Sequence, residues 1–187
     1  ANVVTKTENK EIMDQLAAEL TSKFSNIESI VNNITDSKSG VSFDGKETLV
    51  YGSRVIKEKL KDFTFEVSAN SFFQTNTRAC ETLYGVVEEF AQLKGDEHIL
   101  DLYTGTGTIP IWLSKRAKSV TGIEIVESAI NDAKKNASLN GIDNCHFLVG
   151  DIKDVLGTYS DPVDLLIIDP PRVGMHKDVV KQVLKLK

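Results

Sequence analysis

Apolar residues along the chain follow two different rhythms, one before Gly95 and one after it. Before Gly95, helical spacing over residues 5–24 and 75–93 encloses short segments that alternate in polarity and are broken by Asn, Asp, Ser and Gly. After Gly95, helical patterns separate four continuous apolar runs: "HILDLY", "SVTGIEI", "CHFLVG" and "VDLLIID". Such runs are typical of strands buried on both faces, and their alternation with helices predicts a parallel sheet of βαβ units.

The part of the chain before the sheet is predicted to contain two helices and several short strands. The expected apolar faces are Ile12, Leu16, Leu20 and Phe24 in the first helix, and Cys80, Leu83, Val87 and Phe90 in the second. Between the helices, "IESIVNNI", "GVSF", "ETLVYG" and "FTFEV" are predicted strands. Because these strands are short, we expect residues 1–68 to form a small separate α/β unit, leaving 69–187 for the main sheet.

Within the second part, helical patterns over 109–117, 127–139 and 152–157 connect the four strands, and the last twelve residues are again amphipathic. The fold class is therefore α/β, with the strands in the expected order 3-2-1-4. This order leaves one apolar edge on the fourth strand, through which the chain is expected to self-associate.

Composition narrows the classes of protein that remain. The net charge of −5 gives no basic surplus, which argues against a stand-alone nucleic-acid binder. No apolar run reaches membrane length and no export signal is present, so a cytoplasmic protein without membrane contact is expected. Cys80 and Cys145 lie far apart and match no metal spacing, so no metal site is predicted. The chain starts without Met and stops inside a helical pattern, which indicates an excised piece of a longer protein.

Each of the four predicted strands ends in a polar side chain, and parallel strands place their carboxyl ends at one edge. The first runs from Asp101 into "YTGTGTIP", where Gly105 and Gly107 permit a tight turn and a close approach to a ligand. Pro110 stands where a dinucleotide fingerprint has its third glycine, so that fingerprint fails.

The other three strand ends carry acids, each with two interpretations. Glu124 can accept from both hydroxyls of a ribose, or it simply faces solvent before a helix. Asp151 can accept from an adenine amino group, or it caps the next helix. Asp169 begins "DPPRVG", in which two residues without N–H groups leave a stiff, exposed strand end.

As a set, these features resemble the S-adenosylmethionine-dependent methyltransferases with a Rossmann-like sheet, of which this chain would hold the first four strands. "SANSFFQTN", "DLYTGTGT" and "DPPRVG" together are similar to the RNA uracil-5-methyltransferases, which act on ribosomal or transfer RNA. The resemblance covers residues 45–187 well and the N-terminal part more loosely. It implies methylation of uracil C5 in RNA, with 23S ribosomal RNA as the favoured substrate and S-adenosylhomocysteine as product.

The resemblance also assigns roles to single residues. Asp169 would lie between cofactor and target base and position the base. The implied cofactor-binding residues are Gln74, Asp101, Tyr103, Gly105, Gly107, Thr108, Glu124, Asp151 and Asp169. Phe72 and Phe73 would stack on a flipped base, although at least one is expected in the core. Arg172 would pair with an RNA phosphate, or form a structural ion pair. Thr104 and Thr106 depart from the Cys and Asn frequent in that loop, which suggests a tuned pocket.

The family's chemistry needs more than this chain provides. A thiolate adds at C6 of uracil to activate C5, and a carboxylate then removes the C5 proton. Cys80 and Cys145 are expected in packing positions, so the nucleophilic Cys and the base Glu are expected beyond Lys187. The RNA-binding barrel and iron–sulfur segment of many members would also lie outside the chain. The isolated chain is therefore expected to be inactive.

Two alternatives stay open. Methyltransferases of exocyclic amino groups also use a Pro-Pro strand end, but they usually have an aromatic residue where Arg172 stands. A non-catalytic module that binds a cofactor or RNA would share the glycine turn without the thiolate.

Overall fold

The computed structural model describes residues 1–36 and 45–186, which fall into two compact units. The first contains residues 1–57 and 66–70, and the second contains 58–65 and 71–187. Strands β4 (Val55–Leu60) and β5 (Phe63–Ser68) form a two-stranded sheet whose residues are divided between the units, so the expected boundary at residue 68 lies at the end of this hairpin. The predicted strand "GVSF" lies outside the described residues.

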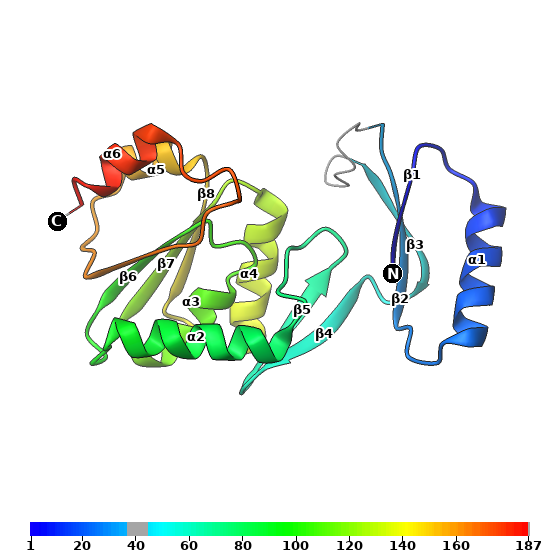
Figure 1. Cartoon of the computed structure of the whole chain (residues 1–187), viewed down its shortest axis with the longest axis horizontal. Coiled ribbons are helices and arrows are strands. Elements are labelled where there is room, and N and C mark those ends of the chain that lie inside the picture. Colours follow the sequence, from blue (N-terminus) through cyan, green and yellow to red (C-terminus); the bar gives the residue numbers. More distant parts are fainter. Residues whose placement is uncertain (37–44, 187) are drawn as a thin grey trace. The chain divides into compact units, whose positions relative to one another are not determined.

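The first unit is a three-stranded sheet with one helix on its face (Figure 1). Its elements are β1 (Asn2–Thr5), α1 (Lys10–Lys23), β2 (Ser29–Ile34) and β3 (Lys46–Gly52). Central β2 runs parallel to β1 and antiparallel to β3. It also buries two amides: Asn32 Nδ2 donates to Val3 O at 2.9 Å, and Asn33 Nδ2 donates to Asn2 Oδ1 at 2.7 Å. These bonds satisfy polar groups that would otherwise destabilise the buried strand.

The predicted apolar face of α1 is only partly right: Leu16 and Leu20 are half-buried, but the two end residues are exposed. The buried residues of this helix are Met13 and Ala17, whereas Ile12 is 58% and Phe24 is 53% exposed. The spacing predicted a helix correctly, but the packed face is centred on Met13 and Ala17 and includes Leu16 and Leu20 only at its margin.

The second unit contains the predicted parallel sheet. Its strands are β6 (His98–Leu102), β7 (Ser119–Glu124), β8 (Cys145–Val149) and β9 (Leu165–Ile168). Their order β8-β7-β6-β9, all parallel, confirms the predicted order 3-2-1-4. Strand β9 is outermost in this sheet, and self-association through it stays a prediction.

Helices cover both faces of this sheet (Figure 1). They are α2 (Thr77–Ala91), α3 (Thr108–Leu113), the 3-10 turn η1 (Ser114–Arg116), α4 (Glu127–Leu139), α5 (Ile152–Thr158) and α6 (Lys177–Val183). Leu100 and Leu102 of β6 pack with Leu156 of α5 and Val179 of α6 on one face. Side chains alternate along a strand, so Asp101 points to the opposite face. Across residues 1–36 and 45–186, no helix combines the length and the apolar character needed to cross a membrane.

Helix α2 is fixed to α3 by the buried Tyr84. Its hydroxyl lies 2.7 Å from Thr108 Oγ1, and its ring packs edge-on against Trp112. Of the predicted apolar face only Cys80 is fully buried, whereas Leu83 is 50% and Phe90 is 81% exposed. The prediction is therefore wrong for Leu83 and Phe90, and the buried side of the helix contains Cys80 and Tyr84 instead.

Replacing Tyr84 with Phe tests this anchor. Tyr84→Phe keeps the ring against Trp112 but leaves the half-buried Thr108 hydroxyl without its partner. We expect the free energy of unfolding to fall by about 1–1.5 kcal/mol in urea denaturation. Thr82→Ala on the same helix removes an exposed hydroxyl bonded only to Arg78 O and should change stability by less than about 0.5 kcal/mol. Equal losses in the two variants would contradict the anchor.

Candidate active site

The four parallel strands of the second unit end at one edge, and their register decides which residues meet there. Leu102 of β6 lies opposite both Ile123 of β7 and Ile168 of β9. The residues that come after these three positions therefore lie beside one another at the edge. The residues at or just past the strand ends on this edge are Tyr103, Glu124, Asp151 and Asp169. The structure thus brings together the strand-end residues that the sequence singled out.

The two glycines of the β6–α3 loop have different environments. Gly105 has φ +55°, and a Cβ added there would meet nothing within 4 Å. Gly107 has φ +77°, and a Cβ there would lie 2.9 Å from both the Ala133 side chain and the Phe147 ring. Gly105 therefore leaves open space for a ligand, whereas Gly107 is required for packing against α4 and β8. The sequence had assigned both glycines to ligand approach.

The carboxylate of Glu124 holds the glycine loop to the end of β7. Its Oε2 accepts from the Gly105 N–H at 3.2 Å. Its Oε1 accepts from the N–H groups of Ile125 and Val126 at 2.9 and 3.0 Å. Glu124 is half-buried and therefore available at the edge, with a geometry already fixed by three backbone donors.

Asp101 is the buried acid of the site. It is only 1% exposed, and neither carboxyl oxygen has a hydrogen-bond partner among the described residues; the same holds for the Thr104 hydroxyl. Burial raises the pKa of Asp101 to about 7, the nearby Thr104 hydroxyl lowers it by less, and the carboxylates of Asp169 and Glu124 raise it further.

Gly122 explains how Thr104 reaches this position. Gly122 of β7 lies opposite Asp101, and a Cβ there would be 2.5 Å from Thr104 Oγ1. The missing side chain leaves the space that Thr104 fills, and the Thr104 N–H donates to Ile123 O at 3.1 Å. Sequence reasoning missed this contact, although a lone glycine inside the apolar run "SVTGIEI" is a recognisable sign of close backbone approach.

Asp151 and Asp169 lie at the outer parts of the edge. Asp151 is the N-cap of α5, because its side chain accepts from the Lys153 N–H at 3.0 Å. Asp169 is exposed, and after it Gly174 N donates to Pro171 O at 2.7 Å, closing a turn. That turn presents exposed Arg172 at its tip, and no ion pair of Arg172 occurs among the described residues.

The segment before α2 carries the two phenylalanines. Phe73 packs its ring 5.7 Å from that of Phe65, as expected for one core aromatic. Phe72 is 72% exposed, and its carbonyl accepts from Thr106 Oγ1 at 3.4 Å, which ties this segment to the glycine loop. Ser71 also donates to Asp132 of α4 at 2.5 Å, a tether that the sequence gave no sign of. Gln74 follows in the same segment and is half-buried.

The two cysteines occupy packing positions. Cys80 is buried in α2, and burial raises its pKa. Cys145 donates to Pro110 O at 3.4 Å, and burial raises its pKa to about 12. Neither thiol is therefore suited to form a thiolate near neutral pH. Over residues 1–36 and 45–186, no group of three or more His, Cys, Asp or Glu side chains is placed to hold a metal ion.

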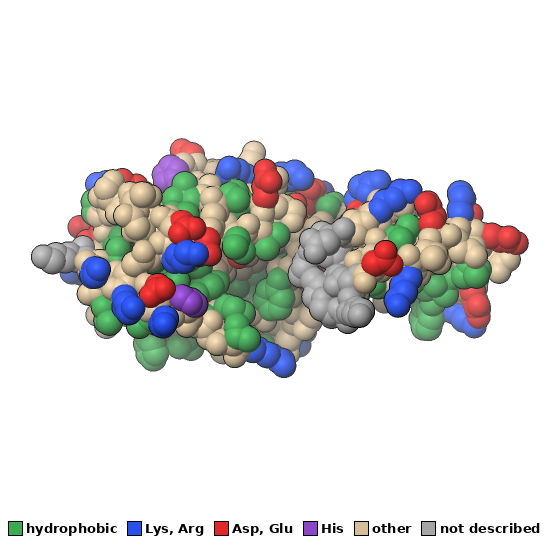
Figure 2. Space-filling model, turned by 90° about the horizontal axis from the view of Figure 1, so that it is seen from above, with side chains coloured by type: hydrophobic (Ala, Val, Ile, Leu, Met, Phe, Trp, Pro, Cys, Tyr) green, Lys and Arg blue, Asp and Glu red, His purple; other side chains and the backbone are tan. Residues whose placement is uncertain are grey.

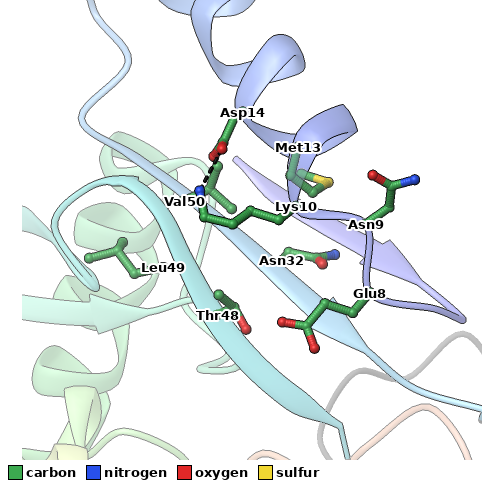
Figure 3. A pocket seen from close by; sticks show the side chains of 9 residues that line it. All are labelled: Glu8, Asn9, Lys10, Met13, Asp14, Asn32, Thr48, Leu49 and Val50. Carbon is green, nitrogen blue, oxygen red and sulfur yellow. Dashed lines mark hydrogen bonds and ion pairs between the residues drawn. The ribbon is translucent and has the colours of Figure 1, made fainter.

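A separate hollow lies in the first unit, between the start of α1 and strands β2 and β3 (Figure 3). Its lining includes the buried Asn32 and the half-buried Thr48, and the Lys10–Asp14 ion pair lies across its upper side. No strand-end acid or glycine turn lines it. None of the site residues predicted from the sequence lines this hollow.

Charged side chains of both signs are interspersed on the face shown in Figure 2. Over the second unit in this view, Lys and Arg lie beside Asp and Glu, with apolar side chains between them. This mixture agrees with a chain of net charge −5.

Comparison with known proteins identifies the family to which the part of the chain containing this sheet belongs. A family profile described as "Methyltransferase domain" matches residues 93–186, which include all four strands of the edge. The chain belongs to the methyltransferase-domain family. Its α/β fold with a parallel sheet is the fold of that family.

Relatives of this methyltransferase domain are named RNA methyltransferases. An uncharacterized RNA methyltransferase of Chlorobaculum tepidum is 38% identical over 100% of the chain and 40% of the relative. One of Oceanobacillus iheyensis is 37% identical over 98% of the chain and 41% of the relative. The chain thus spans about two fifths of the curated relatives that it matches.

A solved structure extends the likeness to the first unit. The tRNA (uracil-54, C5)-methyltransferase of Pyrococcus abyssi, in complex with S-adenosyl-L-homocysteine, is 34% identical with a TM-score of 0.74. The match covers 99% of this chain and 43% of that one. It therefore includes residues of both units.

The two glycines of the loop offer a direct test of their separate roles. Gly107→Ala forces a Cβ against Ala133 and Phe147 at a positive φ, and should lower the free energy of unfolding by about 2–4 kcal/mol. Gly105→Ala meets only the positive φ and should cost about 1 kcal/mol. Thermal or urea unfolding compares the two variants. A larger loss for Gly105→Ala would contradict the packing described.

Proposed function

We propose that the protein is an S-adenosylmethionine-dependent RNA methyltransferase that methylates uracil at C5. In this proposal residues 69–187 form the N-terminal part of the catalytic domain, and residues 1–68 form a small α/β segment that precedes it. The proposal rests on one observation: the Glu124 carboxylate accepts a hydrogen bond from the Gly105 N–H of an open glycine turn. This turn lies on the edge where "DPPRVG" begins after β9. The similarity to a tRNA uracil-C5 methyltransferase with bound S-adenosyl-L-homocysteine supports it.

The edge fits this cofactor in three respects. Gly105 leaves open space over the loop, the Glu124 carboxylate is fixed beside it, and the Asp101 carboxyl lacks a partner below it. Glu124 would hold the ribose hydroxyls, and Asp151 would accept from the adenine amino group while still capping α5. Gln74, Tyr103 and Thr108 belong to the same proposed pocket; Thr108 would act through its bond to Tyr84. When bound, S-adenosylmethionine supplies an electrophilic methyl group on a positively charged sulfur.

Substrate contacts are proposed for the side chains that stay exposed around this edge. The Phe72 ring has a free face on which a flipped base can stack. Asp169 would accept from the base, held there by a strand end that two prolines stiffen. Arg172 has no ion pair in the part of the chain described and would bind an RNA phosphate.

Activation of uracil C5 requires a thiolate that these residues do not provide. Cys145 is held by Pro110 O with its pKa raised to about 12, and Cys80 is buried in α2. The proposal therefore draws the nucleophilic Cys, and the Glu that removes the C5 proton, from a part of the protein outside residues 1–187. The residues described here bind and orient the two substrates.

The ribose contact is tested by substitutions of Glu124. Calorimetry on the intact protein with S-adenosylhomocysteine should show affinity weakened by about 10- to 100-fold in Glu124→Ala, since charge-assisted bonds contribute ~1.5–3 kcal/mol. Glu124→Gln, which keeps an acceptor, should lose less. Exposed Glu127 in the first turn of α4 gives a matched control, and Glu127→Ala should bind as the wild type does. Unchanged affinity in Glu124→Ala would remove this residue from the site.

The reaction itself is tested by the modified nucleoside. Intact protein is incubated with methyl-labelled cofactor and either 23S ribosomal RNA or transfer RNA, and the digested RNA is analysed by mass spectrometry. We expect 5-methyluridine, reduced at least about 100-fold in Asp169→Ala because a positioned acceptor at the base is lost. Label on an exocyclic amino group would favour the amino-methyltransferase alternative. No transfer to either RNA would favour a non-catalytic module.

A further inference from the structure

The ionisable groups close to the Asp101 carboxyl are all acidic. The ionisable groups that interact with it come from the strands on either side, from β8 and from α2: Glu124, Asp169, Cys145 and Tyr84. Helix α3, "TIPIWL", contributes no ionisable side chain. No Lys, Arg or His of the described residues is among the groups that shift the Asp101 pKa. Asp101 is therefore a buried acid beside Thr104, at the start of the glycine loop, and no cation in the described part of the chain balances its charge.

A buried carboxylate without a partner is unfavourable when ionised. Neither Asp101 oxygen has a hydrogen bond of normal geometry among the described residues, and the Thr104 hydroxyl close by lowers the pKa; burial outweighs this effect and raises the pKa to about 7. Near neutral pH, about half of the molecules would therefore hold a proton on Asp101 when no ligand is bound. A positive charge placed close by favours the ionised form and releases that proton.

We propose that Asp101 selects the charge of the ligand at the glycine turn: its carboxyl releases a proton when a sulfonium binds and keeps it when a neutral thioether binds. The inference rests on the proposed function, because it requires the cofactor at this edge. S-Adenosylmethionine and S-adenosylhomocysteine carry the same ammonium and carboxylate groups and differ by the methyl group and one positive charge on sulfur. The proton passes to the solvent, so no other reactant is needed.

Asp101 is better suited to this role than the other two strand-end acids. Asp169 is exposed, so water screens its charge. Glu124 already accepts three backbone N–H bonds, which satisfy its carboxylate without a ligand. Asp101 is the member of this group with both oxygens buried and without partners.

The sign of the pH dependence follows from the direction of the pKa shift. The unliganded protein holds the Asp101 proton below about pH 7 and loses it above, and the sulfonium complex holds the ionised form. Affinity for the sulfonium should therefore rise about tenfold between pH 6 and pH 8, while affinity for the thioether changes much less. The discrimination in favour of the charged cofactor thus increases as the pH rises.

Calorimetry of the intact protein tests the proposal. S-Adenosylhomocysteine, S-adenosylmethionine and sinefungin, whose amine replaces the sulfonium with another cation, are titrated at pH 7 in buffers of different ionisation enthalpy. We expect release of about 0.5 proton with the two cationic ligands relative to the thioether. Asp101→Asn should abolish this difference and make the affinity ratio of the ligands independent of pH. The exposed Asp143 provides a control, and Asp143→Asn should behave as the wild type does.

An infrared measurement covers the case in which Asp101→Asn fails to fold. Wild-type protein near pH 6 should show a protonated carboxyl band that sinefungin removes and S-adenosylhomocysteine leaves. Absence of that band, or equal proton release with all three ligands, overturns the charge-selection proposal while the proposed function stands. Failure of all three ligands to bind overturns both.

Discussion

The site depends on the parallel pairing of β6 with strands on both of its sides. Leu102 is bracketed by Ile123 of β7 and Ile168 of β9, so every residue after these strands emerges at one edge. Ile99, Leu100 and Leu102 of β6 are fully buried, and this apolar burial keeps the register from slipping. A one-residue shift would turn Asp101 to the face covered by α5 and α6. The position of each polar group is therefore set by the packing below it.

Concentrating acids at one edge has an electrostatic consequence. The carboxylates of Glu124 and Asp169 both repel that of Asp101, and the fold accommodates the three acids differently. Asp101 is buried with a raised pKa, Glu124 accepts from three backbone N–H groups, and Asp169 is exposed to water. An arrangement that disfavours negative charge in the empty site favours a positively charged ligand. In the proposed function, this arrangement would favour a cationic cofactor at the edge.

The features that could be predicted from the sequence are those that local residue patterns determine. The four strands of the sheet, their order and the acids at their ends follow from long apolar runs and from the rule that parallel strands end together. Strands β1 and β4 were not predicted. Strand β1 forms by pairing with β2, which follows α1 in the sequence, and apolar and polar residues alternate only weakly along β4. The buried faces of α1 and α2 depend on the tertiary contacts of each helix, so apolar spacing alone placed only part of each face correctly. The packing role of Gly107 and the Gly122–Thr104 contact are likewise tertiary.

The proposed function requires S-adenosylmethionine at the carboxyl edge of β8-β7-β6-β9. A crystal structure of the intact protein with S-adenosylhomocysteine tests this placement. We expect the ribose hydroxyls on the Glu124 carboxylate, the adenine beside Asp151 and the sulfur above the open side of Gly105. Ligand density in the hollow between α1 and β3, or elsewhere with an empty glycine turn, would contradict it.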